Sequence, residues 1–175
     1  VRTVDAPAPS LVLVQARAKG ERDELAVQAA TELGVDAVLP WSSSRSVSRW
    51  EGPKIDKGIA RWAPIVREAS KQAHRARVPE VGPLVSTANL VALASTSRML
   101  LLEPTATTAL TALSLRDETN DIVLVVGPEG GFAPEELERL TAAGATQVRL
   151  GETVLRTSTA GPAAIAVVSA LLARW

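Results

Sequence analysis

Three glycines, a proline and a carboxylate lie between an apolar run and a charged run in "LVVGPEGGFAPEELERL", residues 124–140. Glycines at such a point allow positive φ angles and let backbone N–H and C=O groups approach a ligand closely. The segment follows a run expected to form a buried strand, and open α/β sheets bind ligands where strands end. We therefore interpret residues 127–131, the glycine loop, as a ligand-binding loop. A tight turn that binds nothing is the alternative.

The glycine loop lacks the features of the common nucleotide-binding motifs. A Walker loop has a lysine directly after its second glycine, and none is present here. A dinucleotide fingerprint has a different glycine spacing early in the fold, and Glu129 would repel a phosphate. No Gly-x-Ser-x-Gly elbow is present and His74 is the sole histidine, which disfavours a hydrolase.

Two further segments have a similar character. "LGETVLRTSTAGPAA", residues 150–164, sets the apolar pair Val154–Leu155 beside Arg156 and a run of hydroxyl side chains at 157–159. Apolar backbone next to hydroxyl and guanidinium groups suits a flat heterocycle with a polar tail. "LLLEP" at residues 100–104 ends a neighbouring strand with Glu103, which on its own would be an exposed strand-end charge.

Composition limits the possible classes of protein. A chain of 175 residues with 46% apolar residues fits one globular domain. The absence of cysteine excludes disulfides and thiol catalysis and suits a cytoplasmic protein, and a single histidine argues against a zinc site. We expect no metal and no membrane segment, because the late run "AAIAVVSALLA" is too short to span a bilayer. The first residue is Val, so a native N-terminus is expected to be missing.

Positive charge is concentrated in one third of the chain although the formal net charge is zero. Nine of the 19 basic residues lie between residues 45 and 77, together with only three acidic residues. This distribution is typical of a protein that meets phosphates on one side. A solvated helix face explains it equally well.

Strand-like and helix-like runs alternate along the chain, which predicts an α/β fold with a mainly parallel sheet flanked by helices. The helix over 21–34 is expected to bury Leu25, Ala29 and Leu33, and Trp62 is expected in the core. Pro64 is expected to kink or divide the long helix. Strands are predicted over 10–16, 36–41, 80–86, 98–104, 121–127 and 146–151, and helices over 21–34, 54–77, 88–95, 107–115, 134–144 and 159–175.

Several motifs in a fixed order resemble one enzyme family. "VVGPEGGF" followed by "LGETVLRTSTA" is similar to motifs of the SPOUT-type RNA methyltransferases, and more narrowly of the small-subunit ribosomal RNA methyltransferase E (RsmE) family. Upstream, "ATELGV", "LPWSSSRSV", "RWAPIVREASKQAHR" and "VPEV" resemble further landmarks of that family. The resemblance covers roughly residues 10–175.

The resemblance implies a single SPOUT methyltransferase domain over residues 1–175 with a deep trefoil knot near its C-terminus. It implies a homodimer that transfers a methyl group from S-adenosylmethionine to nitrogen 3 of a uridine in 16S ribosomal RNA of the small ribosomal subunit. The cofactor contacts that it implies are Leu102, Glu103, Gly127, Pro128, Glu129, Gly130, Gly131, Leu150, Gly151 and the stretch from Val154 to Ala160 (Val154, Leu155, Arg156, Ser158, Thr159 and Ala160 in particular).

The chain departs from the family pattern at three points. Ser158 stands where the family has Glu, which puts cofactor affinity or rate in question. Val27 and Gln28 stand where the family tends to have a Glu-Lys pair. The family also has an N-terminal PUA-like RNA-binding domain, which is expected to be missing from this chain.

Catalysis and RNA contact have several candidates. Methyl transfer to an imide nitrogen needs alignment and stabilisation of negative charge on the ring oxygens. The candidates for catalysis are Arg156, Arg45, Arg75 and Gln72, and those for RNA binding are Arg45, Arg49, Arg61, Lys71, His74 and Arg75. Glu129 is a possible base, although we expect it to turn toward backbone N–H groups of its own loop. Trp41 and Trp50 are candidates for stacking on a base.

Two other functions remain open at this point. One is a SPOUT methyltransferase that acts on another RNA, such as tRNA. The other is a non-catalytic RNA-binding or ribosome-assembly module of the same fold, which the Ser158 departure favours.

Overall fold

A seven-stranded sheet forms the centre of the protein. The structure, a computed structural model, describes residues 4–47 and 49–175. The strand order is β3-β2-β1-β6-β5-β7, with β4 pairing beside β2, and each of these pairings is parallel. The strands are β1 (Leu11–Ala16), β2 (Ala37–Ser42), β3 (Glu80–Val81), β4 (Val85–Ser86), β5 (Arg98–Leu102), β6 (Ile122–Val126) and β7 (Thr146–Val148).

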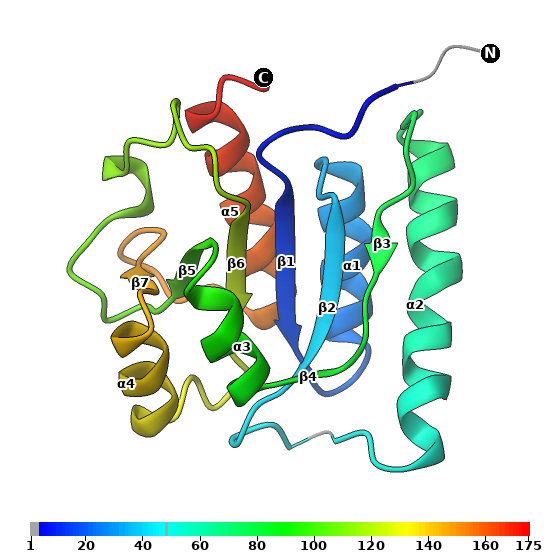
Figure 1. The fold of residues 1–175 in the computed structure, drawn as a ribbon. Helices are drawn as coiled ribbons and strands as arrows, with labels where there is room; N and C mark the ends of the chain where they lie inside the picture. The colour runs from blue at the N-terminus through cyan, green and yellow to red at the C-terminus, as the bar shows by residue number, and fades with distance from the viewer. Residues whose placement is uncertain (1–3, 48) are drawn as a thin grey trace.

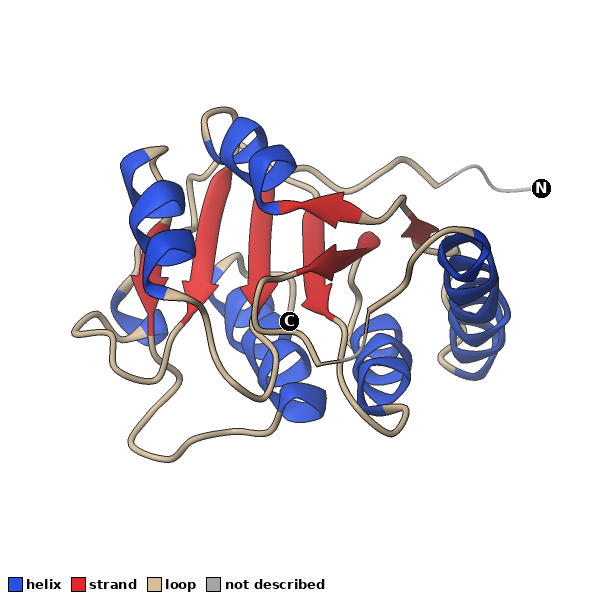
Figure 2. Ribbon diagram, turned by 90° about the horizontal axis from the view of Figure 1, so that it is seen from below, coloured by secondary structure: helices blue, strands red, loops and turns tan. Residues whose placement is uncertain are grey.

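Helices cover both faces of the sheet, as Figures 1 and 2 show. One core joins one face of the sheet to α1, α2 and α5, and the other joins the opposite face to α3 and α4. Strands between two such layers are apolar on both sides, and all five residues of β6 are buried. The helices are α1 (Arg22–Glu32), α2 (Pro53–Gln72), α3 (Thr87–Ala94), α4 (Pro134–Ala142) and α5 (Thr157–Leu171), with a 3-10 turn η1 (Leu110–Ala112).

The predicted α/β class with a mainly parallel sheet is confirmed, but two predicted elements are wrong. The run 107–115 holds only η1, because its backbone pairs with the end of β7: the Leu110 N–H donates to the Arg149 carbonyl, and the Arg149 N–H donates to the Thr108 carbonyl. The predicted strand over 80–86 is divided into β3 and β4 around Pro83, which has no N–H to donate to a neighbouring strand.

The helices differ from expectation in detail. Leu25 is 57% exposed, and α1 instead buries Ala26, Val27 and Ala30, because small residues let it pack closely against α2 and α5. Pro64 lies inside α2 without dividing it. The helix ends at Gln72 rather than at residue 77, and His74 then takes a left-handed φ of 53°.

Candidate functional site

A cavity of about 320 Å³ opens at the carboxyl edge of the sheet, near the point where β1 and β6 lie side by side. The helix that follows β1 packs on one face of the sheet, and the helix that follows β6 packs on the other. Connections that diverge in this way leave a crevice at the strand ends, the usual ligand position in open α/β sheets. The volume is in the range of small-molecule sites.

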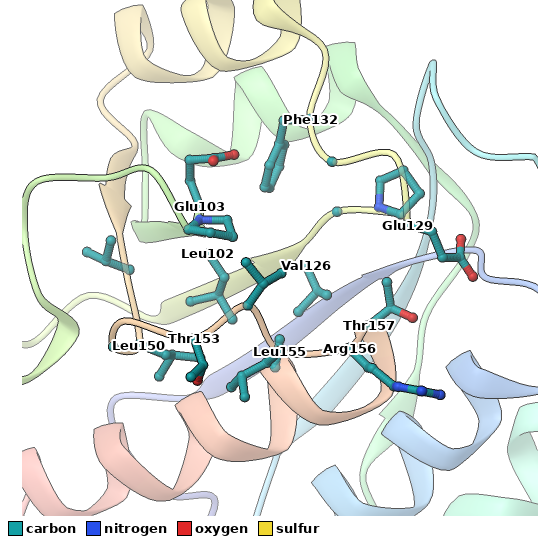
Figure 3. A pocket seen from close by; sticks show the side chains of 18 of the residues that line it. Leu102, Glu103, Val126, Glu129, Phe132, Leu150, Thr153, Leu155, Arg156 and Thr157 are labelled. Atoms are coloured by element: carbon teal, nitrogen blue, oxygen red, sulfur yellow. The ribbon is translucent and has the colours of Figure 1, made fainter.

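The cavity is built by the three segments that the sequence singled out (Figure 3). They are the end of β5, the glycine loop after β6, and the stretch between β7 and α5. Its lining residues are Arg22, Leu102, Glu103, Pro104, Val126, Gly127, Pro128, Glu129, Gly131, Phe132, Val148, Leu150, Gly151, Thr153, Val154, Leu155, Arg156, Thr157 and Ala160. Of the predicted cofactor contacts, the structure leaves Gly130, Ser158 and Thr159 outside this lining.

The glycine loop is held in a tight turn. The Gly131 N–H donates to the Pro128 carbonyl at 2.8 Å, and Gly131 has a φ of 71°, which a side chain disfavours. A Cβ at Gly127 would lie 3.3 Å from the Phe132 ring, and this ring packs against Trp41 with centroids 5.5 Å apart. The loop therefore lines the cavity with its backbone, and the missing side chains of Gly127 and Gly131 leave space for a ligand.

Glu129 binds a different loop from the one expected. Its carboxylate accepts a hydrogen bond from the backbone N–H of Lys19 at 2.9 Å and lies 3.4 Å from Nη1 of Arg22. Lys19 lies in the turn between β1 and α1, and Arg22 is the first residue of α1, so the expected contact with N–H groups of the glycine loop itself is wrong. The carboxylate fastens the glycine loop to that turn across the crevice.

The start of α5 brings unpaired polar groups to the cavity. Thr157 is 8% exposed, and its buried Oγ1 has no hydrogen-bond partner among the described residues. The neighbouring Gln15 is fully buried and donates from Nε2 to the Thr157 carbonyl, while its Oε1 is also without a partner in this part of the chain. The Arg156 guanidinium is exposed and makes no hydrogen bond or ion pair with the described residues. Of these residues, Arg156 and Thr157 line the cavity and can meet a polar ligand.

The Glu103 side chain forms hydrogen bonds within the turn that follows β5. Its carboxylate accepts hydrogen bonds from the N–H and the hydroxyl of Thr105, at 3.1 and 2.9 Å. Its own N–H donates to the Val148 carbonyl, which joins the ends of β5 and β7. Glu103 thus lines the cavity and also shapes the turn after β5.

The structure divides the predicted RNA-binding and catalytic residues between two edges of the sheet. Arg45 lies beside the glycine loop, where its Nη1 donates to the Gly130 carbonyl at 3.1 Å. Arg49 lies in the same loop and donates to the Ser44 carbonyl at 2.9 Å. Gln72 is the last residue of α2, and His74 and Arg75 follow it. This end of α2 lies at the amino edge of the sheet (Figure 1). Within one chain, these three residues are not brought to the cavity.

The Arg75 guanidinium is held by backbone carbonyls and a carboxylate of the protein itself. Its Nη1 donates to the carbonyls of Thr31 and Val35 at 2.9 and 2.6 Å, and Nη2 lies 3.9 Å from Asp36. Burial lowers the pKa of Arg75, and Asp36 acts in the opposite direction. The prediction that Arg75 binds RNA or acts in catalysis is therefore not supported, because its guanidinium joins the segment after α2 to α1 and to the turn before β2.

The other basic residues of α2 are exposed. Arg61 pairs with Glu24 at 2.8 Å, and Lys71 pairs with Glu68 at 2.8 Å. Both remain available to a phosphate, although only Arg61 lies on the half of α2 nearer the carboxyl edge.

The tryptophans are less available than predicted. Trp41 is fully buried, so its predicted stacking on an RNA base is wrong. Trp50 packs against Trp62, with centroids 5.9 Å apart, and Arg17 lies 3.9 Å from its ring centroid. Trp62 is in the core as predicted. The pKa of Arg17, the residue over the Trp50 ring, is lowered to about 10. Burial is the main cause, Glu24 opposes it, and Arg61 adds to it.

Several lining residues were missed from the sequence. Val126 and Val148 are the last residues of β6 and β7, so the strand-end rule could have included them. Phe132 directly follows the glycine loop, and an aromatic residue at that point was a usable signal. Arg22 reaches the cavity only because α1 starts beside β6, a long-range relationship that no local pattern carries. The remaining additions are Pro104 and Thr153, whereas Thr157 was already within the predicted stretch from Val154 to Ala160.

Two other classes of site are without support in the described residues. They contain no cluster of His, Asp or Glu side chains that could hold a metal ion. None of the helices in this part of the chain is long and apolar enough to cross a membrane.

Comparisons with known proteins agree with the geometry. A family model described as an RNA methyltransferase domain matches residues 5–169. The chain is 46% identical over 172 residues to ribosomal RNA small subunit methyltransferase E of Mycobacterium bovis, covering 95% of this chain and 65% of that protein. It is 33% identical over 162 residues to the protein of that name in Bacillus subtilis, covering 86% and 62%. The chain thus spans less than two thirds of the length of either relative.

A solved structure extends the comparison to the fold. The crystal structure of ribosomal RNA small subunit methyltransferase E from Neisseria gonorrhoeae, bound to S-adenosyl methionine, has a TM-score of 0.85 and 34% sequence identity to this chain. The match covers 97% of this chain and 70% of that one.

Proposed function

Because this chain belongs to the RNA methyltransferase family shared with ribosomal RNA small subunit methyltransferase E, we propose that it methylates small-subunit ribosomal RNA with S-adenosylmethionine as the methyl donor. The acceptor that we propose is nitrogen 3 of a uridine in 16S ribosomal RNA. A substrate in the small ribosomal subunit implies that the enzyme acts in the cytoplasm.

The residues of the cavity fit this donor. Leu102, Val126 and Leu155 offer apolar surface to the adenine ring, while the backbone of the glycine loop offers hydrogen-bonding groups that need no side chain. The unpaired Thr157 hydroxyl at the start of α5 suits the polar end of the ligand, because helix N-termini favour negative groups such as a carboxylate. S-adenosylmethionine, when bound, supplies an electrophilic methyl group on a sulfonium.

The chain's own residues would align and activate the acceptor. Uridine N3 carries a proton that must leave before or during methyl transfer, and negative charge then develops on the two ring carbonyl oxygens. The Arg156 guanidinium lines the cavity and is free to stabilise that charge, which makes the N3 proton easier for water to remove. Arg45, beside Gly130, would hold the neighbouring RNA backbone.

We extend the proposal to the knot and the homodimer that the family resemblance implies. The end of β7 supports the knot, because it pairs with β5 on one side while Arg149 is joined by two backbone hydrogen bonds to residues 108–110 on the other. The chain then continues to α5, which packs under β6 and β1. Light scattering that found only monomers at micromolar concentration would contradict the homodimer.

The observation that carries the proposed function is the convergence of the β5 end, the glycine loop and the Val154–Ala160 stretch on one cavity in a chain of this family. The test incubates the purified protein with labelled S-adenosylmethionine and small subunits from a strain that lacks the modification. Nucleoside mass spectrometry should detect 3-methyluridine, and Arg156→Ala should abolish it.

Three other outcomes would redirect the assignment. Label in tRNA but not in small subunits would indicate another RNA substrate. RNA binding without any transfer would indicate a non-catalytic ribosome-assembly module. Undiminished affinity for S-adenosylmethionine in a variant with a filled cavity, such as Ala160→Trp, would remove the donor from this site.

A further inference from the structure

Glu136 is a buried carboxylate that the proposed reaction leaves without a role. It lies in the first turn of α4, directly after the glycine loop, and is 5% exposed. Its Oε1 accepts hydrogen bonds from the Ser44 N–H at 2.8 Å and from the Thr87 hydroxyl at 3.0 Å. Its Oε2 accepts from the Ala133 N–H at 3.2 Å. One side chain therefore joins three segments that are far apart in sequence.

Such a group is retained only if it is well satisfied. Burying a charge costs several kcal/mol unless hydrogen bonds and favourable dipoles offset the loss of water. Glu136 has three donors and lies at the N-terminal end of a helix, where the backbone dipole favours a carboxylate. Capping α4 needs only the Ala133 contact, so the contact with Ser44 serves a different purpose.

That contact fixes the loop that carries two exposed arginines. Ser44 immediately precedes Arg45, whose guanidinium reaches the Gly130 carbonyl at 3.1 Å. Arg49 folds back onto the same loop, with Nη2 donating to the Ser44 carbonyl and Nε to the Ser46 carbonyl, at 2.9 and 3.4 Å. The Ser44 backbone is thus held from both sides, by a carboxylate at its N–H and by a guanidinium at its carbonyl.

We propose that Glu136 is a positioning residue for the acceptor RNA: through the Ser44 N–H it holds Arg45 and Arg49 beside the mouth of the cavity, where they contact the phosphates that flank the target nucleotide. The inference rests on the proposed function, since it assigns the RNA side of the same site. Glu136 itself touches neither the methyl donor nor the reacting atoms.

The test compares Glu136→Gln with Glu135→Gln in the purified protein. Glutamine has one acceptor oxygen and no charge, so the Ser44 N–H and the Ala133 N–H cannot both keep an acceptor, and any bond that Ser44 retains loses the charge that strengthens it. Glu135 is exposed in the same helical turn, so its variant removes an equal charge from the helix end without touching Ser44.

The measurement shows whether Glu136→Gln impairs the use of small subunits, the binding of S-adenosylmethionine, or both. We expect Glu136→Gln to raise KM for unmodified small subunits about tenfold, with kcat and the Kd of S-adenosylmethionine within about twofold of the parent protein, because loss of an orienting contact weakens RNA binding alone. Glu135→Gln should leave all three constants unchanged.

A double-mutant cycle separates positioning from general stability. If Glu136 acts through Arg45, Arg45→Ala alone should raise KM for small subunits, and adding Glu136→Gln should raise it by much less than tenfold again, since coupled residues are not additive. Additive effects, an unchanged KM in Arg45→Ala, or an equal loss of affinity for S-adenosylmethionine and for RNA in Glu136→Gln would each overturn the proposal.

The proposed function can fail separately. If the parent protein binds S-adenosylmethionine but transfers no methyl group to any RNA, the reaction is wrong. Glu136 is then judged on RNA affinity alone, by fluorescence anisotropy with a labelled 16S fragment, where the same two variants must differ about tenfold in Kd for the positioning role to hold.

Discussion

Glu129 in the glycine loop accepts a hydrogen bond from the backbone N–H of Lys19, at 2.9 Å, across the crevice at the carboxyl ends of β1 and β6. The same carboxylate is paired with Arg22 at 3.4 Å. The glycine loop is therefore fastened on one side to the turn before α1 and, through Gly130 and Arg45, on the other side to the loop after β2. Its shape depends on contacts with two segments that are distant in sequence.

Removal of the Glu129 carboxylate should weaken donor binding. We expect Glu129→Ala to raise the Kd of S-adenosylmethionine about tenfold, because hydrogen bonds to charged groups contribute about 1.5–3 kcal/mol and the released loop must be ordered again by the ligand. Glu129→Gln keeps an acceptor for the Lys19 N–H and should cost less than about threefold. Calorimetry measures both, with Glu138→Ala on the exposed face of α4 as the control. Equal losses in the two Glu129 variants would show that the anchor to Lys19 is unimportant.

Substitution by alanine should be costly at Gly131 and well tolerated at Gly130. Gly131 has a φ of 71°, so Gly131→Ala should cost about 1–2 kcal/mol in the left-handed region and weaken binding of S-adenosylmethionine. Gly130 is not among the glycines with positive φ, and a Cβ there would lie 3.6 Å from the Arg45 Cβ, an ordinary contact. Gly130→Ala should therefore stay within about 0.5 kcal/mol of the parent in urea unfolding, as surface substitutions usually do. A reversed order would contradict the turn geometry.

The sequence was a good guide wherever one segment determines the structure. The apolar run over 121–127 predicted β6, and the glycine loop and the 150–164 segment line the same cavity at the strand ends, because strand ends and glycine clusters are local features. The alternation of strands and helices, also a local feature, predicted the parallel sheet. The order of the motifs identified the family, and composition alone could not have done so.

The rest depends on packing between distant segments. Four-residue spacing selected Leu25 as a buried residue of α1, but Ala26 and Ala30 allow closer contact with the neighbouring helices and occupy the core instead. Trp41 was expected to be exposed because it borders a Ser-rich loop, yet its ring is covered by Phe132 and the second core. Glu129 binds Lys19, Glu136 binds Ser44 and Arg75 binds Val35. Each of these pairs is separated by 40 or more residues, beyond the reach of any local pattern.

Arg75 should matter for stability and leave RNA binding unchanged. Its side chain is 15% exposed, and its guanidinium donates to the Thr31 and Val35 carbonyls. Arg75→Ala should lower the free energy of unfolding by about 2–3 kcal/mol, because it removes two hydrogen bonds from a charged donor and takes this donor from the buried Val35 carbonyl. The slope of RNA affinity against salt should not change, since that slope counts phosphate contacts. Arg116→Ala, at an exposed position outside the basic third of the chain, is the control. A lower slope in Arg75→Ala but not in this control would show that Arg75 contacts RNA.

Gly58 is the position where a small residue is required by the packing of Trp50. A Cβ at Gly58 would lie 2.0 Å from the Trp50 ring, which is held between Trp62 and Arg17 and has little room to move. Alanine favours a helix over glycine by about 0.5–1 kcal/mol, but overpacking of this kind costs about 1–3 kcal/mol. Gly58→Ala should therefore destabilise the protein and alter its tryptophan fluorescence. In a Trp50→Ala background the clash is absent, so the same substitution should become neutral or stabilising in urea unfolding. Destabilisation of equal size in both backgrounds would show that the cost arises within α2 and not at the ring.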